Sequence, residues 1–500
     1  MKLLRINPDD NVAVVLAPIV SGEVVSTGNS DITVLEGVSP GHKIALVNIA
    51  AGQPVIKYGQ PIGHASTAIV AGRHVHTHNL ATALDGVLEY TYTPKLANQQ
   101  AREPGIFRGF RRTDGSGEPV GVGIRNEVWV IPTVGCVNAT AEFLAKAARA
   151  EMPRHSSVEG IYAFGHPYGC SQLGDDHENT RRALAGLIRH PNAGGVLVLG
   201  LGCENNDIES LKELLGNYDK NRVKFLVCQD SADEIEDGIA ILRDLVDYAS
   251  CFRREEMPTS ELIIGLKCGG SDGFSGITAN PLVGAFTDRL VAEGGSVILT
   301  EVPEMFGAET LLMNRCCSPE VFDRTVDMIN GFKNYYIENG QNVYENPSPG
   351  NKAGGITTLE DKSLGCVQKG GHANVVDVLN YGDQVRTRGL NLLNGPGNDL
   401  VSASSMTASG AHMILFTTGR GTPFGAPAPT AKISSNTALA TKKHTWIDFD
   451  TGSVLTGVPI ESLCDKFYEY VLALASGDVR AKNEDLGARE FTIFKTGVTL

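Results

Sequence analysis

Residues 194–250 read GGVLVLGLGCENNDIESLKELLGNYDKNRVKFLVCQDSADEIEDGIAILRDLVDYAS. The apolar run at 194–200 is followed by a helical pattern at 207–218, and VKFLVC at 223–228 is followed by a second helical pattern at 231–250. Such a strand–helix–strand–helix series is typical of a parallel sheet covered by helices. The stretch therefore predicts an α/β fold with largely parallel sheets.

The distribution of apolar, polar and turn-forming residues along the whole chain predicts four segments. Short β-rich runs separated by Gly, Pro and Asp turns predict a small β domain at residues 1–80. Residues 81–120 are largely polar, with Pro and Gly, and we interpret them as a linker or wrapping arm. Two α/β domains are expected at residues 121–255 and 256–500.

Asparagines and apolar periodicity predict the positions of several helices. Helices are expected after Asn138 and near Asn179, where an asparagine side chain can cap the first turn. A long helix is expected at about 320–338, and another around 401–409.

The overall composition excludes some classes of protein. The 500 residues are 42% hydrophobic and 20% charged, as in an ordinary globular protein. A formal charge of −14 without a basic stripe argues against a nucleic-acid partner. No apolar run approaches the roughly 18 residues of a membrane helix, and no extended apolar segment follows the first basic residues. We expect a cytoplasmic protein, and a homodimer because the small β domain needs a neighbouring surface.

The ten cysteines include no CxxC pair, so we expect free thiols or metal ligands instead of disulfides. Cys170, Cys203 and Cys268 lie in glycine-rich turns rather than in apolar runs. These three thiols could bind iron if their loops converge, although their separation in sequence fixes no geometry.

Four polar loops each follow an expected strand: GLGCENN, KCGGSDG, TEVPEMFG and TTGRGTPFG. Ligands of open parallel sheets bind beyond the carboxyl ends of the strands. The loops together therefore predict a composite active site. Glu301 and Glu304 in the third loop are further ligand candidates, unless that loop is simply solvated.

His74, His76 and His78 alternate in HVHTHN. On a β-strand this spacing would place all three imidazoles on one face. Neutral imidazole is a ligand for iron, zinc or manganese and titrates near neutral pH. We expect these histidines to bind a metal or to act as general bases, and the alternative is a polar strand face.

Two further loops are suited to holding a hydroxylated acid. Ser271 and Asp272 in the CGGSDGFSGITANP loop can bind hydroxyl groups. Arg420 and Thr422 in GRGTPFG can hold a carboxylate and a hydroxyl group.

The stretch ENPSPGNKAGGITTLEDKSLG, residues 345–365, has almost no apolar periodicity. Asn351, Lys352, Lys362 and its glycine amides are suited to an anionic ligand, and a long solvated connection is the alternative. Glu360 and Asp361 are expected only to favour the start of a helix. The chain has no GxGxxG or GxxxxGK[ST] motif, which disfavours nucleotide binding.

These segments, together with GHKIALVNIA, PTVGCVN, YGCSQLGDDH and the ending FKTGVTL, resemble the altronate dehydratase family, which is related to galactarate dehydratase. The matching motifs span nearly the whole chain in the family's order. The resemblance implies an N-terminal SAF (β-clip) domain, and HVHTHN is similar to the altronate branch.

The resemblance implies a hydro-lyase that removes water from D-altronate to give 2-dehydro-3-deoxy-D-gluconate in hexuronate breakdown. It also implies a divalent metal, Fe²⁺ or else Mn²⁺. We then expect His74, His76 and Lys352 to act in catalysis and His74, His76 and His78 to bind the metal. The substrate is expected to contact Ser271, Asp272, Asn351, Arg420 and Thr422, with Lys352 or Arg420 on its carboxylate.

Two other functions stay open at this point. The first is another acid-sugar or sulfo-acid lyase of the same family, such as a galactarate dehydratase. The second is a non-catalytic protein that binds sugar acids. The polar strand-end loops and the histidine triplet argue against a protein that only binds.

Overall fold

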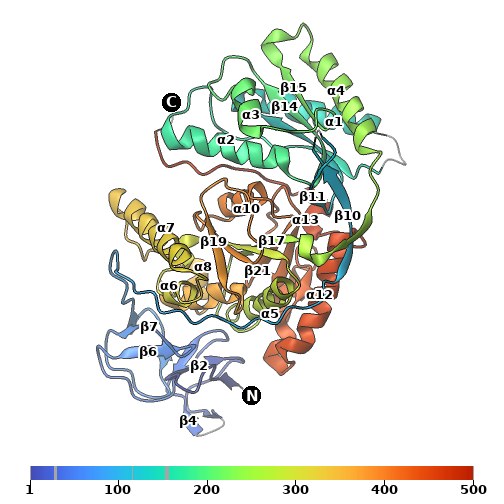
Figure 1. The fold of residues 1–500 in the computed structure, drawn as a ribbon. Coiled ribbons are helices and arrows are strands. Elements are labelled where there is room, and N and C mark those ends of the chain that lie inside the picture. Colours follow the sequence, from blue (N-terminus) through green and yellow to red (C-terminus); the bar gives the residue numbers. More distant parts are fainter. Residues whose placement is uncertain (1, 28–30, 115, 153–156, 499–500) are drawn as a thin grey trace.

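The computed structural model describes residues 2–27, 31–114, 116–152 and 157–498. These residues form a small β domain, an α/β domain with a four-stranded sheet and a larger α/β domain with a seven-stranded sheet. Figure 1 shows the larger domain in the middle, between the other two. The α/β fold with a small N-terminal β domain is confirmed. Among the described helices, none has the length and apolar character that a membrane span needs.

The N-terminal domain consists of short antiparallel strands around an aliphatic core. One sheet has the order β1-β2-β5-β8, a second has the order β6-β7-β9, and β3 pairs with β4. The strands are β1 (Leu3–Leu4), β2 (Val12–Val15), β3 (Val24–Ser26), β4 (Asp31–Thr33), β5 (Lys43–Ala45), β6 (Pro54–Lys57), β7 (Gln60–Ala65), β8 (His74–Val75) and β9 (Leu80–Ala81).

Residues 82–105 contain no helix or strand and run along the larger domain. The Tyr92 hydroxyl donates to the carbonyl of Cys316 (2.7 Å), and the backbone N–H of Arg102 donates to Ala292 (2.8 Å). The arm expected at 81–120 is therefore only partly irregular. Its second part forms strands in an antiparallel sheet of order β11-β10-β16, namely β10 (Ile106–Thr113), β11 (Pro119–Gly123) and β16 (Glu255–Pro258).

The four-stranded sheet is parallel throughout and has the order β13-β12-β14-β15. Separate apolar clusters cover its two faces. Helices α2 and α3 contact each other on one face, and α1 and α4 on the other. The elements are β12 (Glu127–Pro132), α1 (Asn138–Glu151), β13 (Gly160–Ala163), α2 (Gly174–Arg189), β14 (Ala193–Gly200), α3 (Ile208–Leu215), β15 (Val223–Val227) and α4 (Glu234–Ala249).

Two helix starts in this domain differ from the sequence prediction. Asn138 is the first residue of α1 and not its cap, because its side-chain amide donates to the carbonyl of His166 (2.8 Å). Asn179 lies within α2, which begins five residues earlier at Gly174. Asp175 and Asp176 in the first turn favour that earlier start, since carboxylates are favourable at a helix N-terminus.

The larger sheet is also parallel, with the order β19-β20-β18-β17-β21-β22-β23. Its strands are β17 (Ile263–Cys268), β18 (Ser296–Leu299), β19 (Val375–Leu379), β20 (Leu390–Leu393), β21 (Met413–Thr418), β22 (Thr430–Ser434) and β23 (Phe449–Asp450). The helices are α5 (Ala279–Ala292), α6 (Glu309–Met313), α7 (Pro319–Glu338), α8 (Pro349–Ala353), α9 (Leu359–Cys366), α10 (Asp399–Ala408), α11 (Thr437–Lys442), α12 (Ile460–Ser476) and α13 (Lys482–Asp485). The helices expected near 320–338 and 401–409 correspond to α7 and α10.

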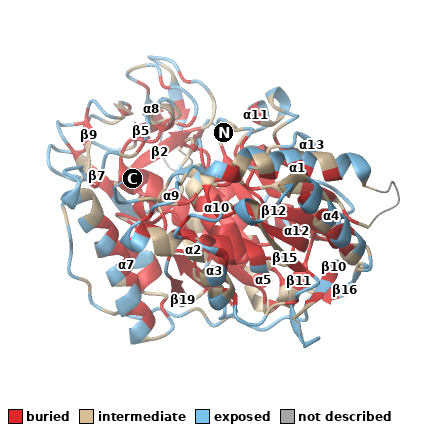
Figure 2. Ribbon diagram, turned by 90° about the horizontal axis from the view of Figure 1, so that it is seen from above, coloured by how far each residue is buried: buried red, intermediate tan, exposed pale blue. Residues whose placement is uncertain are grey.

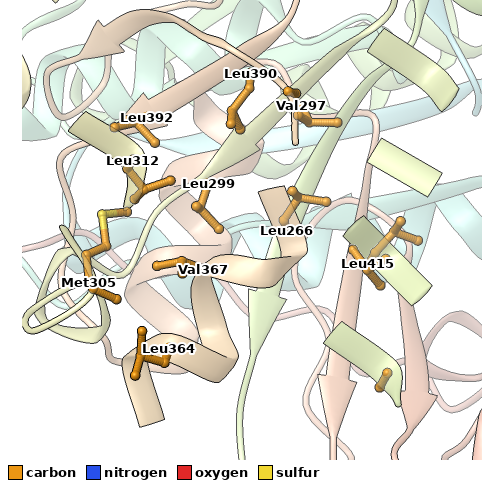
Figure 3. Close-up of a cluster of buried hydrophobic side chains, with 14 of the residues drawn as sticks. Leu266, Val297, Leu299, Met305, Leu312, Leu364, Val367, Leu390, Leu392 and Leu415 are labelled. Carbon is orange, nitrogen blue, oxygen red and sulfur yellow. The ribbon is translucent and has the colours of Figure 1, made fainter. Parts of the chain in front are cut away.

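Helix α9 is fixed to this sheet by apolar packing. Figure 3 shows Leu364 of α9 and Val367 after it in one buried cluster with Leu299 and Leu266 of the strands. Burial of an aliphatic side chain of this size contributes about 1.5–3 kcal/mol. In Figure 2 the buried residues occupy the strands and α9, whereas α7 and α4 present exposed outer faces. The polar residues of α9 are consequently held in defined positions.

A buried charge network joins the four-stranded domain to the end of the chain. The Arg125 guanidinium donates to both carboxylate oxygens of Glu484, at 2.8 Å each. Arg489 pairs with Glu127 at 2.7 Å and with Glu484 at 3.2 Å. Burial opposes ionisation of Glu484, but Arg125 and Arg489 lower the pKa of Glu484 to about 2.

Candidate active site

Helices α8 and α9, which come from the stretch 345–365, lie against the carboxyl edge of the seven-stranded sheet. The side-chain amide of Asn351 donates to the carbonyl of Ser271 (2.8 Å), in the loop after β17. The backbone N–H of Gly273 donates to Gly354 (2.8 Å). Residues 355–367 are all buried. The alternative of a long solvated connection is therefore wrong for this part of the stretch.

Asp361 in the first turn of α9 anchors the N-terminal domain. Its carboxylate accepts hydrogen bonds from Lys43 (2.7 Å) and Lys57 (2.9 Å), and all three side chains are buried. Burial raises the pKa of Asp361, but the two lysines hold that pKa well below its usual range. Lys43 also donates to Thr357 and to the carbonyl of Gly355, at 2.8 Å each. The prediction that Asp361 only starts a helix missed this ion pair between domains.

Glu360 is likewise more than a charge at the start of a helix. Its carboxylate accepts hydrogen bonds from the hydroxyl of Thr82 (2.9 Å) and the backbone N–H of Ala83 (2.7 Å). These two residues begin the arm that leaves the N-terminal domain. Both acids of α9 therefore position that domain.

Three partly buried histidines form a group beside these lysines. Nδ1 of His42 lies 3.0 Å from Nε2 of His74, and Nδ1 of His76 lies 2.8 Å from the hydroxyl of Thr357. One ring nitrogen from each histidine lies within 4.8 Å of the others, close enough to bind one ion. Burial, together with neighbouring His42 and Lys43, lowers the pKa of His74 and of His76 to about 4 each. The imidazoles are thus neutral at pH 7 and can donate lone pairs to a metal.

The expected strand through His74, His76 and His78 is wrong beyond Val75. Strand β8 ends there, and the backbone N–H groups of Asn79 and Leu80 both donate to the carbonyl of His76, which forms a turn. Exposed His78 lies beside His74, with ring centroids 5.4 Å apart and ring planes inclined at 44°. It lies outside the group of ligand atoms, whose third member is His42. The metal-binding role of these histidines stays a prediction.

A second group of metal-type ligands is deeply buried around Cys268. The thiols of Cys268 and Cys366 lie 3.2 Å apart, and each donates to Oε2 of Glu304 at 3.2 Å. Both cysteines are free thiols. Glu301 and Glu304 are 1% and 4% exposed, so the alternative of a solvated loop is wrong for them.

Three lysines surround this thiol–carboxylate group. Nζ of Lys369 lies 2.8 Å from the Cys268 sulfur, and Lys362 pairs with Glu304 at 2.7 Å. Lys267 pairs with Glu301 and, at 2.8 Å, with Asp399. Burial would raise the pKa of Glu304, but Lys362, Lys267 and Lys369 hold that pKa well below its usual range. The group is therefore already balanced by internal charges.

Two of the expected substrate-binding residues have internal partners. Oδ1 of Asp272 accepts from the hydroxyls of Ser275 (2.9 Å) and Ser435 (2.8 Å). Asn351 completes a capping box with Ser348 at the start of α8. These bonds give Asp272 and Asn351 positioning roles, and substrate binding by them stays a prediction. The hydroxyl of Ser271 is buried and has no hydrogen-bond partner among the described residues.

Lys352, Arg420 and Thr422 lie near the same edge and are more accessible. Lys352 is partly exposed on α8, and Arg420 is exposed after β21. A Cβ built on Gly350 of α8 would lie 3.6 Å from Nε of Arg420, which places the guanidinium against this helix. At the other end of α8, the carbonyl of Ala353 lies 3.3 Å from Nε2 of His42. Helix α8 thus connects the histidines to Arg420, while the hydroxyl of Thr422 accepts from the backbone N–H of Phe424 (3.3 Å).

Cys170 and Cys203 do not join Cys268. They are exposed in loops of the four-stranded sheet, whereas Cys268 ends β17 and is buried. Sequence reasoning also missed His42, Lys43, Lys57 and Cys366. The adjacent pair in GHKIALVN was the available signal for His42 and Lys43, because a lysine in an apolar strand needs a partner once it is buried.

The fold and this edge define an α/β enzyme whose composite site combines imidazoles, carboxylates and lysines from separate parts of the chain. Family models match three segments: residues 1–83 as altronate/galactarate dehydratase SAF domain, 109–250 as D-galactarate dehydratase/altronate hydrolase second domain, and 259–499 as D-galactarate/altronate dehydratase, C-terminal. The chain belongs to the altronate/galactarate dehydratase family.

Curated relatives align along nearly the whole chain. Altronate dehydratase of Bacillus subtilis is 51% identical over 499 residues, which cover 99% of each chain. Altronate dehydratase of Escherichia coli is 51% identical over 504 residues and 100% of each chain. Galactarate dehydratase (L-threo-forming) of Escherichia coli is 32% identical over 514 residues, which cover 97% of this chain and 94% of the relative.

Proposed function

We propose that this protein is an altronate dehydratase, a hydro-lyase that converts D-altronate to 2-dehydro-3-deoxy-D-gluconate in hexuronate catabolism. Full-length identity of 51% to two altronate dehydratases supports this substrate over galactarate, for which the identity is 32%. The observation that carries the chemistry is the group of neutral His42, His74 and His76 beside the Lys43–Asp361 pair.

The reaction removes the C2 proton and the C3 hydroxyl group as water, and the resulting enol tautomerises to the 2-keto acid. The C2 proton is weakly acidic because its neighbour is already a carboxylate. Its removal builds a second negative charge that the site must stabilise. A base has to accept the proton, and an acid has to protonate the departing hydroxyl group.

The histidine group fits a divalent ion better than the Cys268 group does. Its three donors are neutral and partly accessible. Around Cys268, by contrast, Lys267, Lys362 and Lys369 already offset Glu301, Glu304 and Asp399. We therefore assign Fe²⁺, or Mn²⁺ in its place, to His42, His74 and His76. A bound divalent ion supplies stabilisation of the second negative charge.

The other polar groups at this edge of the sheet divide the binding and the proton transfers. Arg420 holds the substrate carboxylate, and Ser271 and Thr422 contact hydroxyl groups. The imidazole of His78, exposed beside His74 and outside the ligand group, accepts the C2 proton. The ammonium group of Lys352 protonates the departing hydroxyl; its side chain makes no hydrogen bond or ion pair with the other described residues.

A panel of substrates under anaerobic conditions tests this function. The purified protein, loaded with Fe²⁺, is incubated with altronate, galactarate and other aldonates and aldarates, and formation of 2-keto-3-deoxy acids is measured. Product from altronate alone is expected. Product from galactarate alone would transfer the assignment to the galactarate branch, and no product from any acid would favour a protein that only binds sugar acids.

The assignment of the histidines has a separate test. The variant H78Q is expected to keep its bound metal and lose turnover, whereas H74A is expected to lose the metal. Metal content measured by elemental analysis distinguishes the two roles without relying on activity. The homodimer and the cytoplasmic location stay predictions.

A further inference from the structure

We propose that Cys136, Cys170 and Cys203 bind an iron–sulfur cluster at the carboxyl edge of the four-stranded sheet. This site lies in a different domain from the site around α8 and α9, and it does not rest on the proposed function. Iron–sulfur clusters are held by cysteine thiolates, commonly supplied by separate loops. Five features of the domain support the assignment.

The topology of the sheet brings the three cysteines to one edge. Strands β13, β12 and β14 are adjacent and parallel, so their carboxyl ends lie together. Cys136 follows β12, Cys170 follows β13 and Cys203 follows β14. The carboxyl edge of a parallel sheet is where such folds bind ligands.

Hydrogen bonds join each of the three loops to the other two. The backbone N–H of Gly135 donates to the carbonyl of Tyr168 (2.7 Å), which joins the β12 and β13 loops. The backbone N–H of Asn205 donates to the carbonyl of Cys170 (2.9 Å), which joins the β14 and β13 loops. The side-chain amide of Asn206 donates to the carbonyl of Thr133 (3.0 Å), which joins the β14 and β12 loops. The loops thus form a closed triangle that holds the cysteines near one another.

Each of the three cysteines directly follows a glycine, in VGC, YGC and LGC. A Cβ at Gly135 would lie 3.0 Å from the carbonyl oxygen of His166, so a side chain would disturb the contact between loops. Gly202 has a φ of +122°, which disfavours other residues. Glycines at these places let the backbone approach a bulky inorganic group closely.

The three cysteines lie at the surface of the domain. Cys136, Cys170 and Cys203 are all exposed, whereas Cys228, which follows the fourth strand β15, packs against the apolar cluster of the domain. Packing in a core therefore does not account for the three exposed cysteines. Gln229 donates to the sulfur of Cys203 at 3.7 Å, which leaves that thiol in contact with a polar side chain.

The spacing of the thiols favours a cluster over a single ion. Among the described residues, the groups with three ligand atoms within 4.8 Å of one another are the histidine group and the Cys268 group, and the three exposed cysteines are not one of them. In a cluster each thiolate binds a different iron, so the sulfurs can lie farther apart than the ligands of one ion. A four-iron cluster held by three cysteines keeps one iron without a protein thiolate.

Binding is a ligand exchange that transfers no electrons. A preformed four-iron cluster that carries small thiolates is supplied, and each cysteine thiol replaces one of them. The proton of the cysteine goes to the departing thiolate. Three Fe–S bonds to the protein form as three Fe–S bonds to the small thiolates break.

The experiment uses the full chain under anaerobic conditions with such a preformed cluster. After gel filtration, iron and acid-labile sulfide per chain are measured, together with the visible sulfide-to-iron absorption. The wild type is expected to keep about four irons and four sulfides per chain. The variant C136A/C170A/C203A is expected to lose nearly all of the sulfide, and each single variant most of it.

The matched control is C251A, because Cys251 is an exposed cysteine of the same domain outside the three loops. It is expected to keep the wild-type sulfide content. Circular dichroism and thermal unfolding of the apo proteins check that the triple variant folds. If the triple variant folds and keeps its sulfide, or if the wild type takes up iron or zinc but no sulfide, the proposal is wrong.

Discussion

The two groups of metal-type ligands at the ends of α9 have contrasting surroundings. The group of His42, His74 and His76 is partly accessible, and its donors are neutral. The group of Cys268, Glu304 and Cys366 is almost fully buried, and three lysines pair with its acids. The distances between ligand atoms alone would assign a metal to both groups. The difference teaches that the charge already present around a set of donors decides whether a cation can add to it.

Removing the accessible group is expected to have the largest effect. The double variant H74A/H76A should lose its bound divalent metal and at least about 10²-fold in kcat, as expected when a group that stabilises developing negative charge is removed. Elemental analysis and initial rates on altronate measure the two effects. H64A, which changes a histidine of the same domain outside the group, is the control and should keep both. Near-normal turnover in the double variant would remove these histidines from the mechanism.

Breaking the buried group is expected to affect stability instead. E304Q leaves Lys362 buried without its carboxylate partner, which costs about 3–5 kcal/mol for a buried ion pair. Denaturant unfolding measures the free energy of unfolding, and elemental analysis should show an unchanged metal content at the histidines. E338Q changes an exposed glutamate and should be neutral. Loss of the divalent metal in folded E304Q would reverse the contrast between the two groups.

The buried ion pair between Arg125 and Glu484 is expected to make the free energy of unfolding depend on pH. The pKa of Glu484 is about 2 in the folded chain, below its ordinary value of 4.5. Its contribution to stability is therefore complete above about pH 4.5 and is lost as the pH falls toward 2, to a total of about 3 kcal/mol. Unfolding measured between pH 6 and pH 3 checks the slope. E484Q should be less stable at pH 6 and should show a shallower acid dependence; an unchanged slope would contradict the assignment.

The smallest effect on stability is expected at Lys352, because this lysine, unlike Lys267, Lys362 and Lys369, is not part of a buried ion pair. K352M should leave the free energy of unfolding nearly unchanged, because the partly exposed side chain is outside the buried ion pairs. Loss of the group that protonates the departing hydroxyl should lower kcat/KM by about 100-fold, the lower end of the contribution of a general acid. Steady-state kinetics measures this change. A folded K352M with wild-type kcat/KM would exclude Lys352 from the site.

Much of the fold follows from local patterns in the sequence. The apolar runs and helix periods of residues 194–250 predict β14, α3, β15 and α4, because each element shows its own period. Strand β10 was missed because IFRGFRRT contains three arginines and a glycine and shows no regular alternation of apolar and polar residues. Its pairing with β11, a partner strand, completes the element. Local reasoning fails where a distant segment completes an element.

The candidate site is less predictable because its partners are far apart in the chain. HVHTHN identified His74 and His76, but the third imidazole comes from His42 through a turn that ends the expected strand. Glu360 and Asp361 looked like charges at a helix start, and their ion pair and hydrogen bonds reach across about 280 to 320 residues. Spacing in sequence contains no information on such contacts.

The Lys43–Asp361 pair also has a consequence for biosynthesis. The two residues are 318 positions apart, so at about 5–20 residues per second the N-terminal domain waits roughly 15–60 s for its acid to be synthesised. During that time Lys43 and Lys57 face water, together with the surface that later docks on α9. The histidine group meets Thr357 only after docking. The small domain therefore leaves the ribosome well before the chain has a complete site, and chemistry cannot begin on a nascent chain that lacks α9.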